Sequence, residues 1–463
     1  MSLNEVAEVV SGTVTGVDGA SQAPPTVTEA AFVDSRHVLP GGLFVAIEGE
    51  RVDGHEFAAA AVAQGAAAFL GTRECGVPGV LVEDPLAALG LLARHVVDSL
   101  PGLMVLALTG SQGKTGTKDY LAQVLAAAGP CVATAGNFNN ELGVPLTVLR
   151  ATPETSFLVV EMGARGIGHI ARLCAVAPPR VGAVLNVGTA HLGEFGSREA
   201  IAQAKGEIVE ALPPGGAAVL NASDSLTAAM ADRTAAGVVT FGPSGDVSWR
   251  DVTTDELGRP AFQLGYAGSW APVHLAQLGA HQVENAAAAA AMALAAGLDL
   301  DLVADGLTRA RAESRWRMEP TRRADGLLVI NDAYNANPES TMAALDTLGH
   351  IGRAGGRRTF AVLGEMLELG EGSPAAHRGV GQFLAAAQID VLVTVGSAAE
   401  QVADGARSDP DWRGEAIVTA TRDEALAWMR ENVNPGDVVL VKASRGAALE
   451  HVAQGLLEGN AAR

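Results

Sequence analysis

One short stretch, MVLALTGSQGKTGTKDY at residues 104–120, limits what this chain can fold into more than any other part of it. The apolar run from Met104 to Leu108 predicts a fully buried strand, which ends at Gly110. A helix-compatible sequence follows from Thr115. A strand, a glycine-rich loop and Lys-Thr at the start of a helix together predict a loop that binds a polyphosphate through its backbone N–H groups.

In this interpretation Lys114 contacts the outer phosphates and the hydroxyl of Thr115 binds Mg²⁺. The complete phosphate-loop pattern has a further glycine where Leu108 stands, so this loop is a shortened form. The alternative is an ordinary glycine-containing turn between a strand and a helix. The residues expected at the phosphates are Gly110, Ser111, Gln112, Gly113, Lys114, Thr115 and Gly116.

The use of lysine favours the first interpretation. The chain has only four lysines, Lys114, Lys118, Lys205 and Lys442, and the other 28 of its 32 basic residues are arginine. Arginine carries surface charge equally well, but it cannot replace a compact ammonium at a phosphate or an amine that must lose its proton. Each lysine is therefore a candidate site residue.

Length and charge bound the class of protein. At 463 residues the chain is too long for one core and predicts about three domains. Its 48% hydrophobic and 18% charged residues are typical of a globular protein, and its formal net charge of −20 makes a nucleic-acid backbone an unfavourable partner. An acidic protein that binds a nucleotide must gather positive charge locally, which agrees with the lysines.

The start of the chain, the lengths of its apolar runs and its cysteines predict the cellular compartment. The start, MSLNEVAEVV, has no basic segment of a signal peptide, and no apolar run is long enough to span a membrane. The cysteines Cys75, Cys131 and Cys174 are odd in number and widely spaced. They are interpreted as reduced thiols, and we expect a cytoplasmic protein without membrane insertion.

The order of apolar and helical segments predicts an α/β chain of three domains. Residues 1–100 form a small α/β domain, and the Pro-Gly of DSLPG, near residue 100, is a linker candidate. Residues 101–315 form a central α/β domain around the phosphate loop. Residues 316–463 alternate apolar strands with helices, which predicts a doubly wound, Rossmann-like sheet.

Two polar residues follow predicted strands of the central domain. Phe157–Val160 reads as a buried strand that ends in Glu161, and ligands of open α/β sheets bind at the carboxyl ends of strands. Glu161 is therefore a candidate for organising Mg²⁺, with a surface carboxylate as the alternative. His191 follows the predicted strand Val181–Val187, and by itself it reads more simply as a structural histidine.

Taken together and in order, the motifs of the chain resemble those of the Mur ligase family. The resemblance covers nearly the whole length. It rests on SR…PGGLFVAIEGERVDGHEF, TGSQGKTGTK, NFNNELGVPLT, VVEMGARGIGHI, AHLGEFGS, AKGEI, YNANP, VLGEMLELG and KASRG. The segment NFNNELGVPLT, at residues 137–147, resembles in particular the members that attach D-alanyl-D-alanine.

The resemblance implies the reaction. ATP would phosphorylate the terminal carboxylate of UDP-MurNAc-tripeptide, and the amine of D-alanyl-D-alanine would then attack the acyl phosphate. The products would be UDP-MurNAc-pentapeptide for peptidoglycan synthesis, ADP and phosphate. Several negative charges meet in such a reaction, so lysines and Mg²⁺ must neutralise them. The partners are thus small molecules, and we expect a monomer.

The resemblance also implies roles for individual residues. Thr115 and Glu161 would hold one Mg²⁺, and His191 would help to hold a second. Lys205 matches a lysine that takes up CO₂ as a carbamate, which arginine cannot do. Further contacts implied by resemblance are Asn285, Arg317 and Asp332 at ATP; Ser35, Arg36, Asn137 and Asn139 at the UDP substrate; and Tyr334, Asn335, Asn337, Lys442 and Arg445 at the acceptor and third domain.

Four positions depart from the family pattern. Gln282 replaces the first asparagine of HNxxN, and Trp316 precedes Arg317 where many relatives have glycine. Gly116 replaces a Ser or Thr, and Ala443 replaces a glycine. None of these changes removes a reacting group, but each bears on nucleotide affinity.

The rival interpretations fall into three classes: another amide-forming relative, a nucleotide switch and a scaffold without activity. A related ligase that adds the third residue of the peptide carries a DNPR motif, which is absent here, and a folylpolyglutamate synthase is the other close rival. A GTPase-like switch needs an NKxD motif, yet no lysine of this chain follows an asparagine. A scaffold without activity would not need Lys114, Glu161, His191 and Lys205 together.

Overall fold

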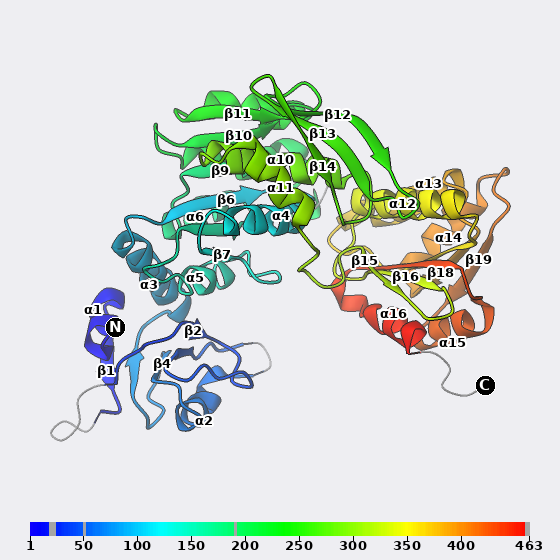
Figure 1. Cartoon of the computed structure of the whole chain (residues 1–463). Helices are drawn as coiled ribbons and strands as arrows, with labels where there is room; N and C mark the ends of the chain where they lie inside the picture. Colours follow the sequence, from blue (N-terminus) through cyan, green and yellow to red (C-terminus); the bar gives the residue numbers. More distant parts are fainter. Residues whose placement is uncertain (18–24, 50–51, 189–191, 459–463) are drawn as a thin grey trace.

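A computed structural model describes residues 1–17, 25–49, 52–188 and 192–458. Three separate sheets follow one another along the chain, each built from one continuous stretch of sequence (Figure 1). This confirms the predicted three-domain α/β class. The borders at residues 100/101 and 315/316 stay predictions; they fall between the last element of one sheet unit and the first element of the next.

The first unit holds a five-stranded sheet in the order β1-β5-β4-β3-β2, in which only β1 is antiparallel to its neighbour. The apolar faces of α1 and α3 close one side of it over Leu43, Val45 and Leu70. Its elements are α1 (Leu3–Val10), β1 (Thr13–Thr15), β2 (Ala31–Phe32), β3 (Leu43–Val45), α2 (Ala58–Ala63), β4 (Ala68–Gly71), β5 (Gly79–Leu81) and α3 (Pro85–Ser99).

The central unit is a nine-stranded sheet in the order β14-β13-β12-β11-β10-β9-β6-β8-β7. Its elements are β6 (Met104–Thr109), α4 (Lys114–Ala126), β7 (Cys131–Ala133), α5 (Gly143–Val148), β8 (Phe157–Glu161), α6 (His169–Val176), β9 (Val181–Val184), α7 (Leu192–Phe195), α8 (Arg198–Glu210), β10 (Ala217–Asn221), α9 (Ser225–Ala228), β11 (Gly237–Phe241), β12 (Val247–Thr254), β13 (Pro260–Tyr266), β14 (Ser269–His274), α10 (Gln282–Ala295) and α11 (Leu300–Arg309).

The third unit is a six-stranded sheet in the order β15-β16-β20-β17-β18-β19, parallel except for the edge strand β15. Helices cover both of its faces, as a doubly wound sheet requires. Its elements are β15 (Glu319–Arg322), β16 (Leu328–Asp332), α12 (Pro338–Gly355), β17 (Thr359–Leu363), α13 (Ser373–Ala386), β18 (Val391–Val395), α14 (Glu400–Arg407), β19 (Glu415–Thr419), α15 (Arg422–Asn432), β20 (Val438–Lys442) and α16 (Glu450–Leu457).

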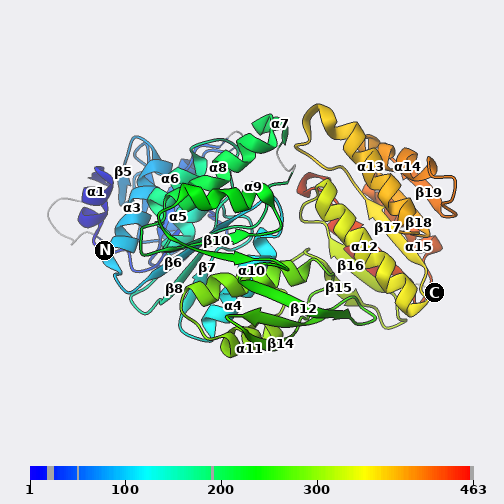
Figure 2. The same ribbon diagram turned by 90° about the horizontal axis from the view of Figure 1, so that it is seen from above.

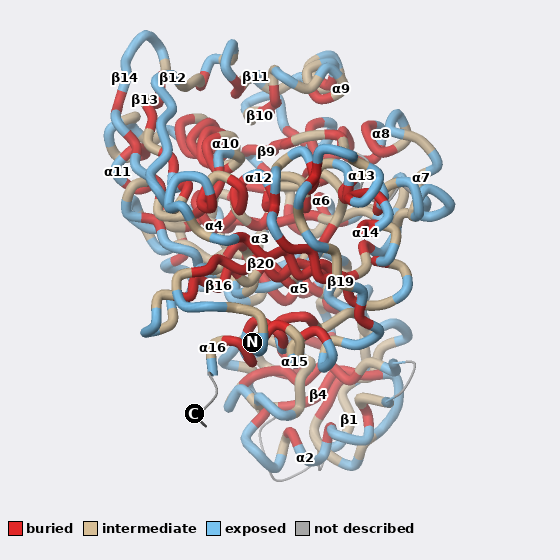
Figure 3. The backbone as a smooth tube through the Cα atoms, turned by 90° about the vertical axis from the view of Figure 1, so that its right-hand side faces the viewer, coloured by how far each residue is buried: buried red, intermediate tan, exposed pale blue. Residues whose placement is uncertain are grey.

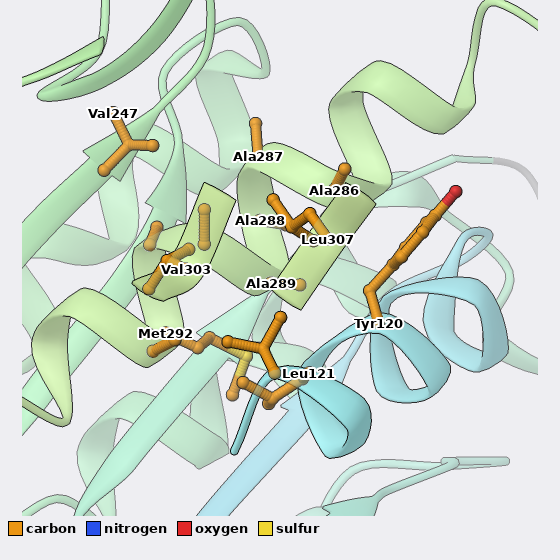
Figure 4. Packing of buried hydrophobic residues seen from close by; sticks show 14 of the residues in the cluster. Tyr120, Leu121, Val247, Ala286, Ala287, Ala288, Ala289, Met292, Val303 and Leu307 are labelled. Atoms are coloured by element: carbon orange, nitrogen blue, oxygen red, sulfur yellow. The ribbon is translucent and has the colours of Figure 1, made fainter. Parts of the chain in front are cut away.

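The core of the central unit fixes the phosphate-loop helix in place. Helix α10 carries six consecutive alanines, Ala286–Ala291, each at most 1% exposed. Because these side chains are small, α10 packs closely against both the sheet and α4, where Tyr120 and Leu121 meet it (Figure 4). The Tyr120 hydroxyl donates to Gln277 Oε1 at 2.8 Å, so this buried polar atom is satisfied.

The antiparallel strands β12, β13 and β14 were not anticipated. They extend the central sheet into a hairpin that reaches helix α12 of the third unit (Figure 2). At its tip the Asp255 carbonyl lies 2.9 Å from His350 Nε2, and Leu257 packs against the third unit's core. Buried residues concentrate in the sheets and in α10, whereas the second half of β12 is exposed (Figure 3). Within the described residues, no helix is long and apolar enough to cross a membrane.

Candidate active site

A large cleft of about 1090 Å³ lies between the central and third units. The carboxyl ends of β6 and β8 and the start of α10 border it on one side, and those of β16 and β20 on the other. Predicted site residues that line it are Ser111, Gln112, Gly113, Lys114, Thr115, Gly116, Asn137, Asn139, Glu161, Lys205, Asn285, Arg317, Asp332, Tyr334, Asn335, Asn337, Lys442 and Arg445.

The loop at residues 110–113 has the geometry of a phosphate loop. Gly113 has a positive φ of 79°, and a Cβ there would lie 2.4 Å from Asn285 Oδ1, so both the backbone and the space require glycine. Lys114 Nζ donates to the carbonyl oxygen of Gly110 at 2.7 Å, which folds the side chain over the loop. Burial lowers the pKa of Lys114, and the nearby carboxylate of Glu161 opposes this shift.

Asn186 is a site residue that the sequence interpretation missed. Strand β9 ends at Val184, short of the predicted Val187, so Asn186 lies in the loop beyond it. Its Oδ1 accepts from the backbone N–H groups of Ser111 and Gln112, both at 3.0 Å. The side chain thereby fixes the backbone of the phosphate loop at Ser111 and Gln112. An asparagine just past a strand at this sheet edge was the available clue.

Glu161 and Thr115 meet at the start of α4. Thr115 Oγ1 donates to Glu161 Oε2 at 3.1 Å, and Asn139 Nδ2 donates to Glu161 Oε1 at 2.8 Å. The backbone N–H of Glu161 donates to Thr134 Oγ1, which fixes the end of the strand. Glu161 is only 2% exposed. The two carboxylate oxygens are thus held by side chains from two different segments, and the Glu161 backbone is held by a third.

Lys205 lies on helix α8 and is 5% exposed, yet within the described part of the chain its amine has no hydrogen bond or ion pair. Burial lowers the pKa of Lys205 well below its usual range, and the positive charge of Lys114 lowers it further. A buried lysine without a counter-charge is costly to keep protonated. The structure therefore favours a neutral amine that faces the cleft.

Lys442 on the opposite wall is in a different environment. Its Nζ donates to Asp332 Oδ2 at 2.6 Å and to the Asn335 carbonyl at 2.9 Å. The other oxygen of Asp332 accepts from the backbone N–H of Met318 at 3.1 Å, so this carboxylate also joins the linker to the sheet. Burial lowers the pKa of Lys442, and the charge of Asp332 opposes that shift.

Two arginines stack on aromatic rings at this wall. The Arg317 guanidinium lies 4.4 Å from the centre of the Tyr334 ring and donates from Nη2 to Thr115 Oγ1 at 3.4 Å. The Arg445 guanidinium lies 4.3 Å from the Trp316 ring and pairs with Glu450. Trp316 thus serves as a platform for Arg445, which gives a physical role to a residue that departed from the family pattern.

Other predicted residues take secondary places. Asn285 Nδ2 donates to Gln282 Oε1 at 3.1 Å, so the substituted Gln282 still touches the nucleotide-side asparagine. A Cβ at position 116 would lie 3.1 Å from Asn285 Nδ2, so Gly116 leaves room for this pair. Asn337 Oδ1 accepts from the Ser340 N–H at 2.8 Å and caps α12, so this side chain organises the wall.

The structure does not bring all predicted residues together. Ser35 and Arg36 lie in the first unit away from the lining of this cleft, and Arg36 forms hydrogen bonds with Asp34 at 2.8 and 2.9 Å. This pairing holds the pKa of Asp34 well below its usual range. His191 lies outside the described residues. Lys118, which the lysine pattern had marked, is buried on α4 and is not among the cleft-lining residues.

Comparison with known proteins identifies the family. Three domain families match consecutive parts of the chain: the Mur ligase family catalytic domain over residues 29–96, the Mur ligase middle domain over 108–293, and the Mur ligase glutamate ligase domain over 316–445. Together they span most of its length.

Individual relatives agree with the domain matches. UDP-N-acetylmuramoyl-tripeptide–D-alanyl-D-alanine ligase of Mycobacterium tuberculosis is 47% identical, over 99% of this chain and 98% of the relative. A crystal structure of MurF from Acinetobacter baumannii is similar, with a TM-score of 0.87 and 33% identity over 99% and 98% of the two chains. MurF from Thermotoga maritima in complex with ADP has a TM-score of 0.79 and 31% identity over 93% and 98%. This chain therefore belongs to the Mur ligase family.

Proposed function

We propose that this protein is the ATP-dependent ligase that joins D-alanyl-D-alanine to UDP-MurNAc-tripeptide in peptidoglycan synthesis. The observation that carries this assignment is a single cleft that combines a phosphate loop, a buried carboxylate and two lysines without acidic partners among the described residues. Its relatives over nearly the full length bear the name of this activity.

In the first step, a carboxylate oxygen of the tripeptide attacks the γ-phosphorus of ATP, and the bond from that phosphorus to the β–γ bridging oxygen breaks. The loop N–H groups and Lys114 stabilise the charge that gathers on the phosphates. In the second step the amine of D-alanyl-D-alanine attacks the acyl carbon, loses a proton, and phosphate leaves. Arg317, Asp332 and Asn285 orient the nucleotide in this proposal.

The residues fit Mg²⁺, since the Thr115 hydroxyl and the Glu161 carboxylate offer hard oxygen ligands 3.1 Å apart. When bound, Mg²⁺ neutralises phosphate charge. We assign this pair to one Mg²⁺ site, and Lys205 as a carbamate with His191 to a second. Carbamate formation needs a neutral amine: its lone pair bonds to the carbon of CO₂, and the lost proton passes to solvent. The unpaired, buried amine of Lys205 supports this assignment.

Substrate contacts complete the proposal. Asn137 and Asn139 at the cleft, with Ser35 and Arg36 of the first unit, would contact the UDP-MurNAc-tripeptide. Tyr334, Asn335, Asn337, Lys442 and Arg445 would face the D-alanyl-D-alanine side. We propose a monomer that acts in the cytoplasm, because all substrates are soluble small molecules and each predicted group comes from one chain.

The test is phosphate release from ATP by the purified protein. Release should require both UDP-MurNAc-tripeptide, with lysine or diaminopimelate as third residue, and D-alanyl-D-alanine. Free lysine, diaminopimelate or glutamate as acceptor should give little turnover. Ligation of one of these amino acids to the UDP-MurNAc-dipeptide would instead assign the chain to the ligase that adds the third residue.

A further inference from the structure

We infer that Asp119 and Gln123, which follow Thr115 on the same face of α4 but do not line the cleft, are positioning residues for this reaction. They fix the linker between the central and third units so that Arg317 reaches Thr115. The inference rests on the proposed function, in which Arg317 contacts ATP. It also gives a role to Lys118, which the sequence analysis made a candidate site residue but which does not line the cleft.

Three ties connect α4 to the linker, one on each of three successive helical turns. Thr115 Oγ1 accepts from Arg317 Nη2 at 3.4 Å. Asp119 Oδ2 accepts from the Ser314 backbone N–H at 3.2 Å. Residues 115, 119 and 123 are four apart and therefore share one face of the helix. The linker runs along this face in the opposite direction.

The third tie is the strongest in geometry. Gln123 Nε2 donates to the Arg311 carbonyl at 2.8 Å, and Gln123 Oε1 accepts from the Arg311 backbone N–H at 2.9 Å. One carboxamide thus satisfies both polar groups of one linker residue. Such a two-bond pairing fixes the register of the linker as well as its distance from the helix.

Lys118 supports the middle tie. Its ammonium forms an ion pair with Asp119, and the two side chains are only 5% and 8% exposed. Asp119 is thereby kept as an acceptor in a buried place where a lone carboxylate would be costly. The cluster is independent of the phosphate loop, although it lies on the same helix.

On its other side the linker belongs to the third unit. The Trp316 N–H donates to Glu319 Oε2 at 3.0 Å, and the Trp316 carbonyl accepts from the Tyr334 N–H at 3.3 Å. Arg315 is therefore the one residue between the last tie of the linker backbone to α4, at Ser314, and the first tie to the third unit, at Trp316. Arg317 moves with the third unit, but its guanidinium contacts the central one.

This arrangement makes the position of Arg317 depend on the register that Gln123 sets. The Arg317 Nε is buried and has no hydrogen-bond partner among the described residues, as expected for a group held ready for a ligand. A shift of the linker by a fraction of a residue would move that group away from Thr115. Displacements of about 1 Å at a reacting centre cost up to about 100-fold in rate.

The test compares the full-length variants Gln123→Ala, Arg317→Ala and their combination, with Gln382→Ala as the matched control. Gln382 is exposed on α13 and makes no hydrogen bond within the described residues. We expect Gln123→Ala to lower kcat about tenfold, as for one or two lost hydrogen bonds, with KM for D-alanyl-D-alanine unchanged. The control should match the wild type.

The combined variant distinguishes positioning from general stabilisation. If Gln123 acts through Arg317, Gln123→Ala should cost little further activity once Arg317 is alanine. A further tenfold loss, or an unchanged kcat in Gln123→Ala alone, would overturn the inference. Should Gln123→Ala melt below the assay temperature, Gln123→Glu, which keeps the acceptor for Arg311 N–H, is judged by the same criteria.

The two proposals fail in different ways. If Arg317→Ala keeps the kcat of the wild type, the assigned ATP contact of Arg317 is wrong, and the positioning role falls with it. If Arg317→Ala is impaired while Gln123→Ala is not, the proposed function stands and only the positioning inference is wrong.

Discussion

The two walls of the cleft carry positive charge in different ways. On the central wall, Lys114 Nζ donates to a backbone carbonyl and Lys205 has no partner among the described residues. On the third-domain wall, Lys442 pairs with Asp332 and Arg445 pairs with Glu450. Lys114 on the central wall thus presents a positive charge that an anionic ligand must neutralise, and Lys205 presents a neutral amine, whereas protein carboxylates already neutralise Lys442 and Arg445 on the opposite wall. The phosphates and the reacting carboxylate belong on the first wall.

The largest expected effect is a loss of stability when Lys442 on the third-domain wall is replaced. Lys442→Met should lower the free energy of unfolding by about 3–5 kcal/mol, because Asp332 would stay buried without its partner. The combination with Asp332→Asn should recover a large part of that loss. Chemical denaturation of the two variants measures both values. A Lys442→Met protein as stable as the wild type would show that the walls do not differ in this way.

The next largest expected effect is a loss of activity when Lys114 on the central wall is replaced. Lys114→Ala should reduce kcat about 100- to 1000-fold, because charge stabilisation that grows during phosphoryl transfer is lost. Its denaturation midpoint should change little, since no buried acid loses its partner. Steady-state phosphate release and a denaturation curve on the same preparation check this. Near-wild-type turnover in the folded variant would contradict the role of the loop lysine.

Lys205 sharpens the comparison by chemical rescue. Lys205→Ala should lose about 10- to 100-fold in kcat, as for a group that orients a metal, and a short carboxylic acid in solution should restore part of it. Lys205→Arg should be as impaired as Lys205→Ala, because arginine keeps a positive charge but cannot take up CO₂. An arginine variant as active as the wild type would mean that only a cation is needed at this position.

The smallest expected effect is a pH slope. Because burial lowers the pKa of Lys205 in the folded protein, the unfolded chain binds an extra proton between that value and about 10.4. Stability should therefore rise with pH across this window, by up to about 1.4 kcal/mol per pH unit. Without ligands and CO₂, the wild type should lose stability relative to Lys205→Met as pH falls. Parallel stability curves would show that Lys205 stays protonated in the fold.

Much of the fold could be predicted because its strands are apolar runs with sharp ends. The strand predicted from Phe157 to its end at Glu161 has the bounds that the structure gives, and the one predicted over Met104–Leu108 is one residue longer in the structure. The β12–β14 hairpin was missed because its strands are half exposed and carry polar residues such as Arg250 and Asp251. A long buried strand is set by local composition, but an exposed one is set by its neighbours.

The site was predictable where a residue type has few other uses. Lys114 and Glu161 could be predicted as cleft residues, because a lysine in such a loop and a carboxylate at a strand end have few other roles there. Both line the cleft. Asn186 was missed because it acts through backbone groups far away in the sequence. The ties of Asp119 and Gln123 to the linker depend on a segment almost 200 residues later in the chain. No local pattern encodes such contacts.

The single residue between the ties at Ser314 and Trp316 has a consequence for the cost of closing the cleft. A domain on a long flexible tether would lose much of its rotational and translational freedom on docking, about 4–15 kcal/mol for independent bodies. A joint whose free part is the backbone of Arg315 has two torsions to fix. Ordering one residue's backbone costs about 1–2 kcal/mol of entropy. Less of the substrate binding energy is therefore needed to bring the central and third units together, and more of it can lower the barrier of the reaction.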